Sequence, residues 1–297
     1  MKTTGSLVKD TLRPDMSDVF SSYLLRYVQA SAAEGVPVFA LTLQNELHSE
    51  PDDYPGMRLD SPARARRADR TAPEAPAGAA RPEDAAHRVE PQLGRAAGAT
   101  GGTGRPGREP LHRGRRLALL RGRGAVAGAG RAVHDAYPHK DTWCTECSGG
   151  EWKPHWPETL SWMVRNIVIG STRGWARGVL LWNLAFNENH GSHAGGCEGS
   201  RDVVTIDSRT GEVTRKLEYY ALAHASKFVR PGARRVDSTA EEAGLDTVAF
   251  RNADDGSIAL IVCNSAPDVR RMSVRVGGQA FAYDMPRESI ATFLWKP

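Results

Sequence analysis

Short apolar runs that end in polar residues constrain the fold of this chain more than any other feature of its sequence. Residues 36–43 and 178–184 are nearly continuous apolar runs, and residues 140–147 form a third segment with strand character. Runs of this length are typical of parallel strands that are buried on both faces. We therefore expect a parallel sheet whose strands carry polar residues, such as Asn45 and Glu46, at their carboxyl ends.

Helical patterns alternate with these strands. From Ser17, a favoured N-cap residue, apolar side chains recur at helical spacing through Val28, and Gly35 provides a stop signal. Pro157 opens a second predicted helix, which extends through Val168. Alternating strands and helices predict a parallel α/β architecture, and polar residues at strand ends favour a partial (β/α)8 TIM barrel.

The pattern changes after about residue 215. Residues 217–229 have the spacing of an amphipathic helix, and shorter alternating runs follow at 247–251, 257–263, 272–276 and 289–295. Turn signals at residues 254–256 and 277–278 separate these runs. We predict one barrel fragment with strand 4 over residues 1–65, another with strands 7 and 8 over 132–230, and a small antiparallel β-sandwich over 231–297.

The segment 66–131 fits neither pattern. It contains 14 arginines and no lysine, and Ala, Gly, Arg and Pro make up 47 of its 66 residues. A disordered linker is one interpretation, because such a composition cannot bury enough surface to fold. A GC-rich coding sequence translated in a shifted frame gives the same mixture, and we favour this interpretation because flanking sequence uses both Lys and Arg.

Composition excludes several classes of protein. The net charge of +4 comes from the segment 66–131, so we expect no nucleic-acid partner. No apolar run is long enough to form an integral membrane segment. The first 15 residues lack the apolar core of a secretory signal, so the default expectation is a cytoplasmic protein unless the native N-terminus precedes Met1.

The cysteines and histidines do not suggest a metal site. Cys144 and Cys147 form a single C-x-x-C, and we expect buried or partly buried thiols there. His190, His193 and Cys197 lack a visible fourth ligand. We predict no metal and no cofactor.

Two glutamates have the spacing expected of a pair at one barrel mouth. Glu46 and Glu146 are 100 residues apart, and a barrel of about 250 residues uses about 31 residues for each βα unit. Three units therefore separate them, which places them at the ends of strands 4 and 7. Retaining glycoside hydrolysis requires two carboxyl groups about 5–5.5 Å apart.

Five sequence segments together resemble glycoside hydrolase family 30, the glucosylceramidase-like clan A retaining β-glycosidases. They are MKTTGSL (1–7), LTLQNE (41–46), WCTECSGG (143–150), GVLLWNLAFNENHG (178–191) and EYYALAHASKFVRPGA (218–233). The resemblance implies that Glu46 is the general acid/base and Glu146 the nucleophile. It also implies that Asn45, Trp182 and His193 contribute to substrate binding.

The resemblance implies a retaining hydrolase that cleaves a β-glucosidic bond in a β-glucoside or a glucosylated lipid. An endo-β-glucanase or xylanase of the same family is one alternative, and an inactive remnant or carbohydrate-binding protein is another. The sequence departs from the family pattern, because Leu47 replaces the family proline and strands 1–3, 5 and 6 are not legible. We therefore expect an N-terminally truncated chain with low or no turnover.

Overall fold

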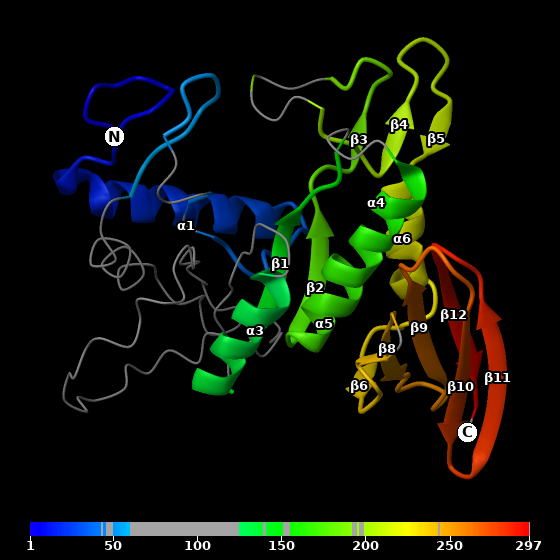
Figure 1. Ribbon diagram of the computed structural model, residues 1–297. Helices are drawn as coiled ribbons and strands as arrows, with labels where there is room; N and C mark the ends of the chain where they lie inside the picture. The colour runs from blue at the N-terminus through cyan, green and yellow to red at the C-terminus, as the bar shows by residue number, and fades with distance from the viewer. Residues whose placement is uncertain are drawn as a thin grey trace. The chain divides into compact units, whose positions relative to one another are not determined.

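The protein is described by a computed structural model, which covers residues 1–42, 44–45, 50–59, 125–138, 141–150, 155–191, 195, 199–242 and 244–296 (Figure 1). The chain forms two compact units. Predictions for Glu46, Leu47, His193 and residues 66–124 lie outside the described residues. Within the described ranges, no helix is long and apolar enough to cross a membrane.

The first unit contains helix α1 (Ser17–Ala33), which follows the 3-10 turn η1 (Pro14–Met16). The helix predicted from Ser17 is thus confirmed, although Met16 rather than Ser17 occupies the N-cap position. Gly35 follows the helix with a φ of 78°, a conformation that glycine adopts without steric cost. A small core anchors the helix and consists of Leu12, Phe20, Met57 and Leu59.

The strand predicted over residues 36–43 is wrong for the part of that run that the structure describes. Residues 36–42 have no regular structure, and Val36 and Phe39 are exposed. A strand requires a hydrogen-bonded neighbour, and residues 36–42 pair with no described strand. The apolar composition alone does not supply that partner.

The second unit begins with a strand–helix–strand arrangement. Strand β1 (Thr142–Cys147) leads into one continuous helical rod, made of α4 (Trp156–Trp162), the π-helical stretch η3 (Met163–Gly170) and α5 (Ser171–Arg173). Pro157 lies in the first turn of α4, as predicted. The rod returns the chain to β2 (Ala176–Leu181), which is paired with β1, and both strands point the same way in Figure 1. This is the βαβ unit expected of a barrel.

Helix α3 (Ala125–Ala136) precedes β1. It begins inside the segment 66–131 that the composition marks as aberrant, so the last residues of that segment are helical.

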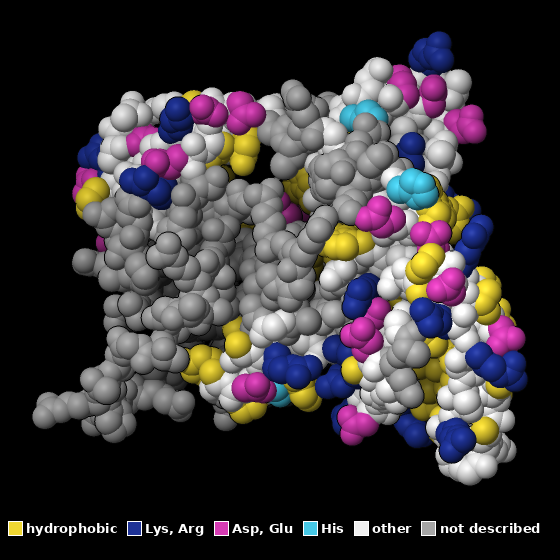
Figure 2. Space-filling model, in the orientation of Figure 1, with side chains coloured by type: hydrophobic (Ala, Val, Ile, Leu, Met, Phe, Trp, Pro, Cys, Tyr) yellow, Lys and Arg dark blue, Asp and Glu magenta, His cyan; other side chains and the backbone are white. Residues whose placement is uncertain are grey.

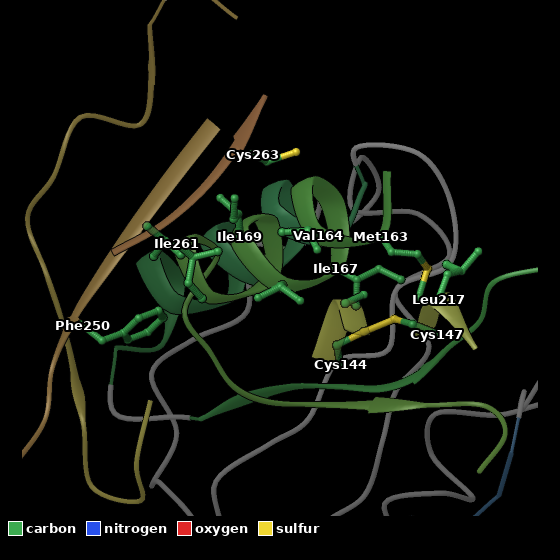
Figure 3. Packing of buried hydrophobic residues seen from close by; sticks show 13 residues of the cluster. Cys144, Cys147, Met163, Val164, Ile167, Ile169, Leu217, Phe250, Ile261 and Cys263 are labelled. Atoms are coloured by element: carbon green, nitrogen blue, oxygen red, sulfur yellow. A yellow bond between two sulfur atoms is a disulfide. The ribbon is translucent and has the colours of Figure 1, made fainter. Parts of the chain in front are cut away.

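The core of the second unit lies between the helical rod and the strands (Figure 3). Val164 and Ile261 are fully buried in it, and Ile261 comes from the C-terminal sheet. Cys144 and Cys147 are buried here as expected, but they are joined in a disulfide instead of being thiols. Cys263 is a buried thiol, and burial raises its pKa to about 12.

Three short strands and a helix follow β2. They are β3 (Ala185–Phe186), β4 (Val204–Ile206), β5 (Val213–Arg215) and α6 (Leu217–Ser226). β4 pairs in parallel with β3 and antiparallel with β5. The predicted helix at 217–229 is therefore confirmed, although it ends three residues early.

The C-terminal part is antiparallel, as predicted. β6 (Arg234–Val236), β7 (Glu241–Glu242), β8 (Leu245–Arg251), β9 (Ile258–Asn264) and β12 (Ser289–Trp295) form one sheet. β10 (Arg270–Val276) and β11 (Gln279–Met285) form a separate hairpin. Its turn residues Gly277 and Gly278 have φ values of 55° and 83°, which a two-residue turn with two left-handed positions requires.

Candidate active site at the ends of strands β1 and β2

Glu146 is the second-last residue of β1. Its side chain is partly exposed, whereas the flanking Cys144 and Cys147 are buried in the core. The strand therefore holds a partly solvent-accessible carboxylate close to its carboxyl end, which is where barrel enzymes carry their reacting groups. The sequence prediction for the position of Glu146 agrees with this placement.

Trp182 follows the last residue of β2 and lies beside the end of β1. Its backbone N–H donates to the carbonyl oxygen of Cys147 at 2.8 Å, so the backbone of Trp182 is hydrogen-bonded to the residue that follows Glu146. The indole side chain is 50% exposed. An exposed aromatic side chain at the end of a strand is suited to stack against the apolar face of a pyranose. The structure thus brings together Glu146 and Trp182, two of the predicted site residues.

The loop after β3 has a fixed local conformation. The side-chain oxygen of Asn187 accepts hydrogen bonds from the backbone N–H groups of Asn189 and Gly191, at 3.0 and 2.9 Å. The N–H of Asn187 also donates to the carbonyl of Gly191 at 2.6 Å. His190 occupies the left-handed region with a φ of 56°. His193, one of the residues predicted to bind substrate, follows this loop and lies outside the described residues.

The other half of the predicted site belongs to the first unit. Asn45 is exposed there, and Glu46 lies outside the described residues. The pairing of Glu46 with Glu146 stays a prediction. Among the described residues, no three His, Cys, Asp or Glu side chains lie close enough to share a metal ion.

Comparisons with known proteins show which family this chain resembles. Residues 232–293 match the model of the glycosyl hydrolase family 30 beta sandwich domain. An endo-1,6-beta-D-glucanase of Neurospora crassa is 24% identical over 323 residues, an alignment that covers 98% of this chain and 61% of that protein. The chain is therefore similar to glycoside hydrolases of family 30. It spans about three fifths of the length of this curated relative.

A solved structure shows the same fold. The endo-beta1,6-glucanase BT3312 superimposes with a TM-score of 0.75 at 22% identity, covering 98% of this chain and 66% of the other. The lysosomal acid glucosylceramidase of Mus musculus is more distant, because its 29% identity extends over 45% of this chain and 25% of that protein. The relatives therefore favour the glucanase alternative over the glucosylceramidase expectation.

The structure also shows buried polar residues that sequence reasoning missed. Glu218, in the first turn of α6, is 1% exposed and accepts a hydrogen bond from Nε of Arg201 at 3.0 Å. Asp202 is equally buried and accepts from the N–H of Phe186 at 2.9 Å. Burial raises the pKa of Glu218 above its usual value, and Arg201 opposes this effect. In the sequence, a glutamate in the first turn of a helix is normally solvated, so no local signal identifies this one.

The surface of the sandwich carries charges of both signs. On the face seen in Figure 2, Lys and Arg side chains are interspersed with Asp and Glu over the described C-terminal residues. The sandwich also carries an exposed ion pair between Arg271 and Asp284, at 3.2 Å. On this face the described residues form no continuous basic surface of the kind that binds a phosphate backbone.

Proposed function

We propose that this chain carries the nucleophile half of a retaining β-glucanase site, with Glu146 as the nucleophile and a β-1,6-linked glucan as the substrate. The observation that carries the proposal is the position of Glu146 at the end of β1, with Trp182 hydrogen-bonded to the next residue. The chemistry of the linkage is inferred from two relatives that are named endo-1,6-glucanases.

The proposed reaction is a double displacement. A carboxylate oxygen of Glu146 attacks the anomeric carbon, the glycosidic C–O bond breaks, and the leaving oxygen takes the bonding electron pair together with a proton from the acid. Glu46 is the predicted acid, and it then activates the water that releases the sugar from Glu146. Trp182 would stack on the sugar ring and hold the anomeric carbon near the carboxylate.

A covalent trapping experiment tests the nucleophile without requiring Glu46. In a 2-deoxy-2-fluoro-β-glucoside with a dinitrophenyl leaving group, the phenolate departs without protonation and the glycosyl-enzyme accumulates. The full chain should gain one sugar on Glu146, within the tryptic peptide of residues 141–165, because trypsin does not cleave Lys153 before Pro154. Fragment ions distinguish Glu146 from Glu151 in the same peptide.

The controls for this experiment separate the proposal from its alternatives. Glu146→Gln should abolish labelling, while Glu212→Gln, at an exposed turn residue, should leave it unchanged. Labelling elsewhere, or none at all, would refute the nucleophile assignment. Binding of a glucan without labelling would support the carbohydrate-binding alternative.

The substrate is tested with a matched panel of polymers. We expect a linear β-1,6-glucan to be cleaved internally and faster than β-1,3-glucan, β-1,4-glucan, xylan or glucosylceramide. Turnover is expected to be low, so product analysis by mass spectrometry after long incubation is the appropriate measurement. Preferred hydrolysis of glucosylceramide would contradict the glucanase proposal and restore the glucosylceramidase one.

A further inference from the structure

A short segment, residues 200–203, is hydrogen-bonded to the residues that follow strands β1 and β2. On one side, the N–H of Arg201 donates to the carbonyl of Gly149 at 3.0 Å, and Ser200 bridges to Gly150. Gly149 is three residues beyond Glu146. This segment, called the strap below, therefore ties down the chain where it leaves β1.

The same strap holds the chain where it leaves β2. The N–H of Val203 donates to the carbonyl of Asn183 at 3.1 Å, and Asn183 directly follows Trp182. One residue earlier, Oδ2 of Asp202 accepts from the N–H of Phe186 at 2.9 Å. Four consecutive residues thus contact the segments that follow both Glu146 and Trp182.

A buried ion pair fixes the strap to helix α6. Nε of Arg201 lies 3.0 Å from Oε1 of Glu218, and their side chains are 12% and 1% exposed. Burying two charges is expensive and is compensated only by a close, well-oriented partner. The pair therefore selects one position of Arg201 relative to α6.

The Glu218 carboxylate also limits which residue can occupy the position of Gly149, after β1. A Cβ added to Gly149 would lie 2.1 Å from Oε1 of Glu218, far inside van der Waals contact. Because Glu218 is buried and held by Arg201, this oxygen cannot move aside easily. Gly149 is thus positioned by the strap through its carbonyl and by Glu218 through direct contact.

We propose that Glu218 and Arg201 are positioning residues for the site. They hold the backbone that follows β1 and β2, so that Glu146 and Trp182 contact the same sugar. This inference rests on the proposed function, because it assumes that Glu146 is the nucleophile. The geometric requirement is strict: a displacement of about 1 Å at a reacting group can cost about 100-fold in rate.

The test measures the kinetics of Glu146 labelling by the dinitrophenyl fluoroglucoside in the full chain. Glu218→Gln removes the charge but keeps the side-chain shape, and it should lower the maximal labelling rate about 10-fold with less than a threefold change in the half-saturating concentration. Gly149→Ala should lower the rate about 100-fold. Combining Gly149→Ala with Glu218→Asp shortens the opposing side chain and should restore most of the lost rate.

Asp246→Asn is the matched control. Asp246 forms an ion pair with Arg165 at the same distance of 3.0 Å, in a more exposed setting, and that pair joins the helical rod to β8. Both single substitutions should lower thermal stability. Only Glu218→Gln should slow labelling of the folded fraction, and equal labelling rates in the two variants would overturn the positioning role.

Hydrogen exchange separates this proposal from the proposed function. If the wild-type chain is not labelled at Glu146, the proposed function fails, and the strap is then judged by the amide protons of Arg201 and Val203. They should lose protection in Glu218→Gln and keep it in Asp246→Asn, because they are the donors to the two strand exits. Unchanged protection in both variants would overturn the role of Glu218.

Discussion

Arg173 should contribute about 2–3 kcal/mol to the stability of the second unit. Its guanidinium, at the end of the helical rod, donates to the carbonyls of Ser238, Thr239 and Thr247 and to the hydroxyl of Ser238, at distances from 2.5 to 3.0 Å. All four acceptors belong to the C-terminal sheet or to the segment that leads into it. Arg173 therefore connects the βαβ unit to the sandwich through hydrogen bonds rather than through apolar contact.

The magnitude follows from these bonds. The Nε–H and the two Nη2–H groups are three donors shared among four acceptors, and at about 1.3 kcal/mol for each donor the set gives about 4 kcal/mol, while holding the side chain in place costs about 1–2 kcal/mol of rotamer entropy. Arg173→Ala should therefore lower the free energy of unfolding by about 2–3 kcal/mol. Part of the site remains hydrated, so the upper end of this range is a ceiling.

Urea unfolding of the full chain, followed by circular dichroism, measures this effect. Arg209→Ala is the control, because Arg209 is an exposed turn residue and its substitution should change stability by less than about 0.5 kcal/mol. Arg173→Lys should recover only part of the loss, since one ammonium cannot match the fork of a guanidinium. An Arg173→Ala variant as stable as the Arg209→Ala variant would refute the reasoning.

Three further substitutions test the packing, the titration and the backbone of the second unit. Ile261 is fully buried between the rod and the sheet, so Ile261→Ala should cost about 2–5 kcal/mol in urea unfolding, and a loss below 1 kcal/mol would contradict its place in the core. Burial lowers the pKa of His224 below 6.5, and Nδ1 lies 3.0 Å from Thr292 Oγ1. Because the unfolded chain takes up a proton first, stability should fall as pH decreases below about 6.5, by up to about 1.4 kcal/mol per pH unit. His224→Gln should remove this part of the pH dependence, and an unchanged profile would be evidence against it. Gly278→Ala should lower the melting temperature through its φ of 83° alone, because a Cβ there meets open space, whereas Ala280→Gly in the adjoining strand serves as a control for flexibility.

Local sequence signals predicted those elements whose partners are close in the chain. Pro157 marked the start of the rod, and Gly277 and Gly278 marked the turn of the β10–β11 hairpin. The strand β11 itself was missed, because every residue from Gln279 to Asp284 is exposed and no buried face marks the run. The opposite error occurred at residues 36–42, where apolar residues that suggested a buried strand remain without a partner among the described residues.

In the site, too, the sequence predicted what depends on neighbouring residues and missed contacts between residues far apart in the chain. A strand pattern followed by polar residues was enough to place Glu146 near a strand end, because side-chain position along a strand is a local property. What fastens that strand end is not local: Gly149 meets Arg201 and Glu218, which are 52 and 69 residues further along the chain. No periodic pattern in the sequence reveals a contact between residues so far apart.

Glu146 and Glu218 show why residue type alone does not identify function. Both are glutamates, but Glu146 is partly exposed at a strand end, whereas Glu218 is buried against Arg201 and Gly149. A nucleophile must reach its substrate, so burial excludes Glu218 from that role and agrees with the positioning role proposed for it. The role proposed for each carboxylate therefore follows from its surroundings.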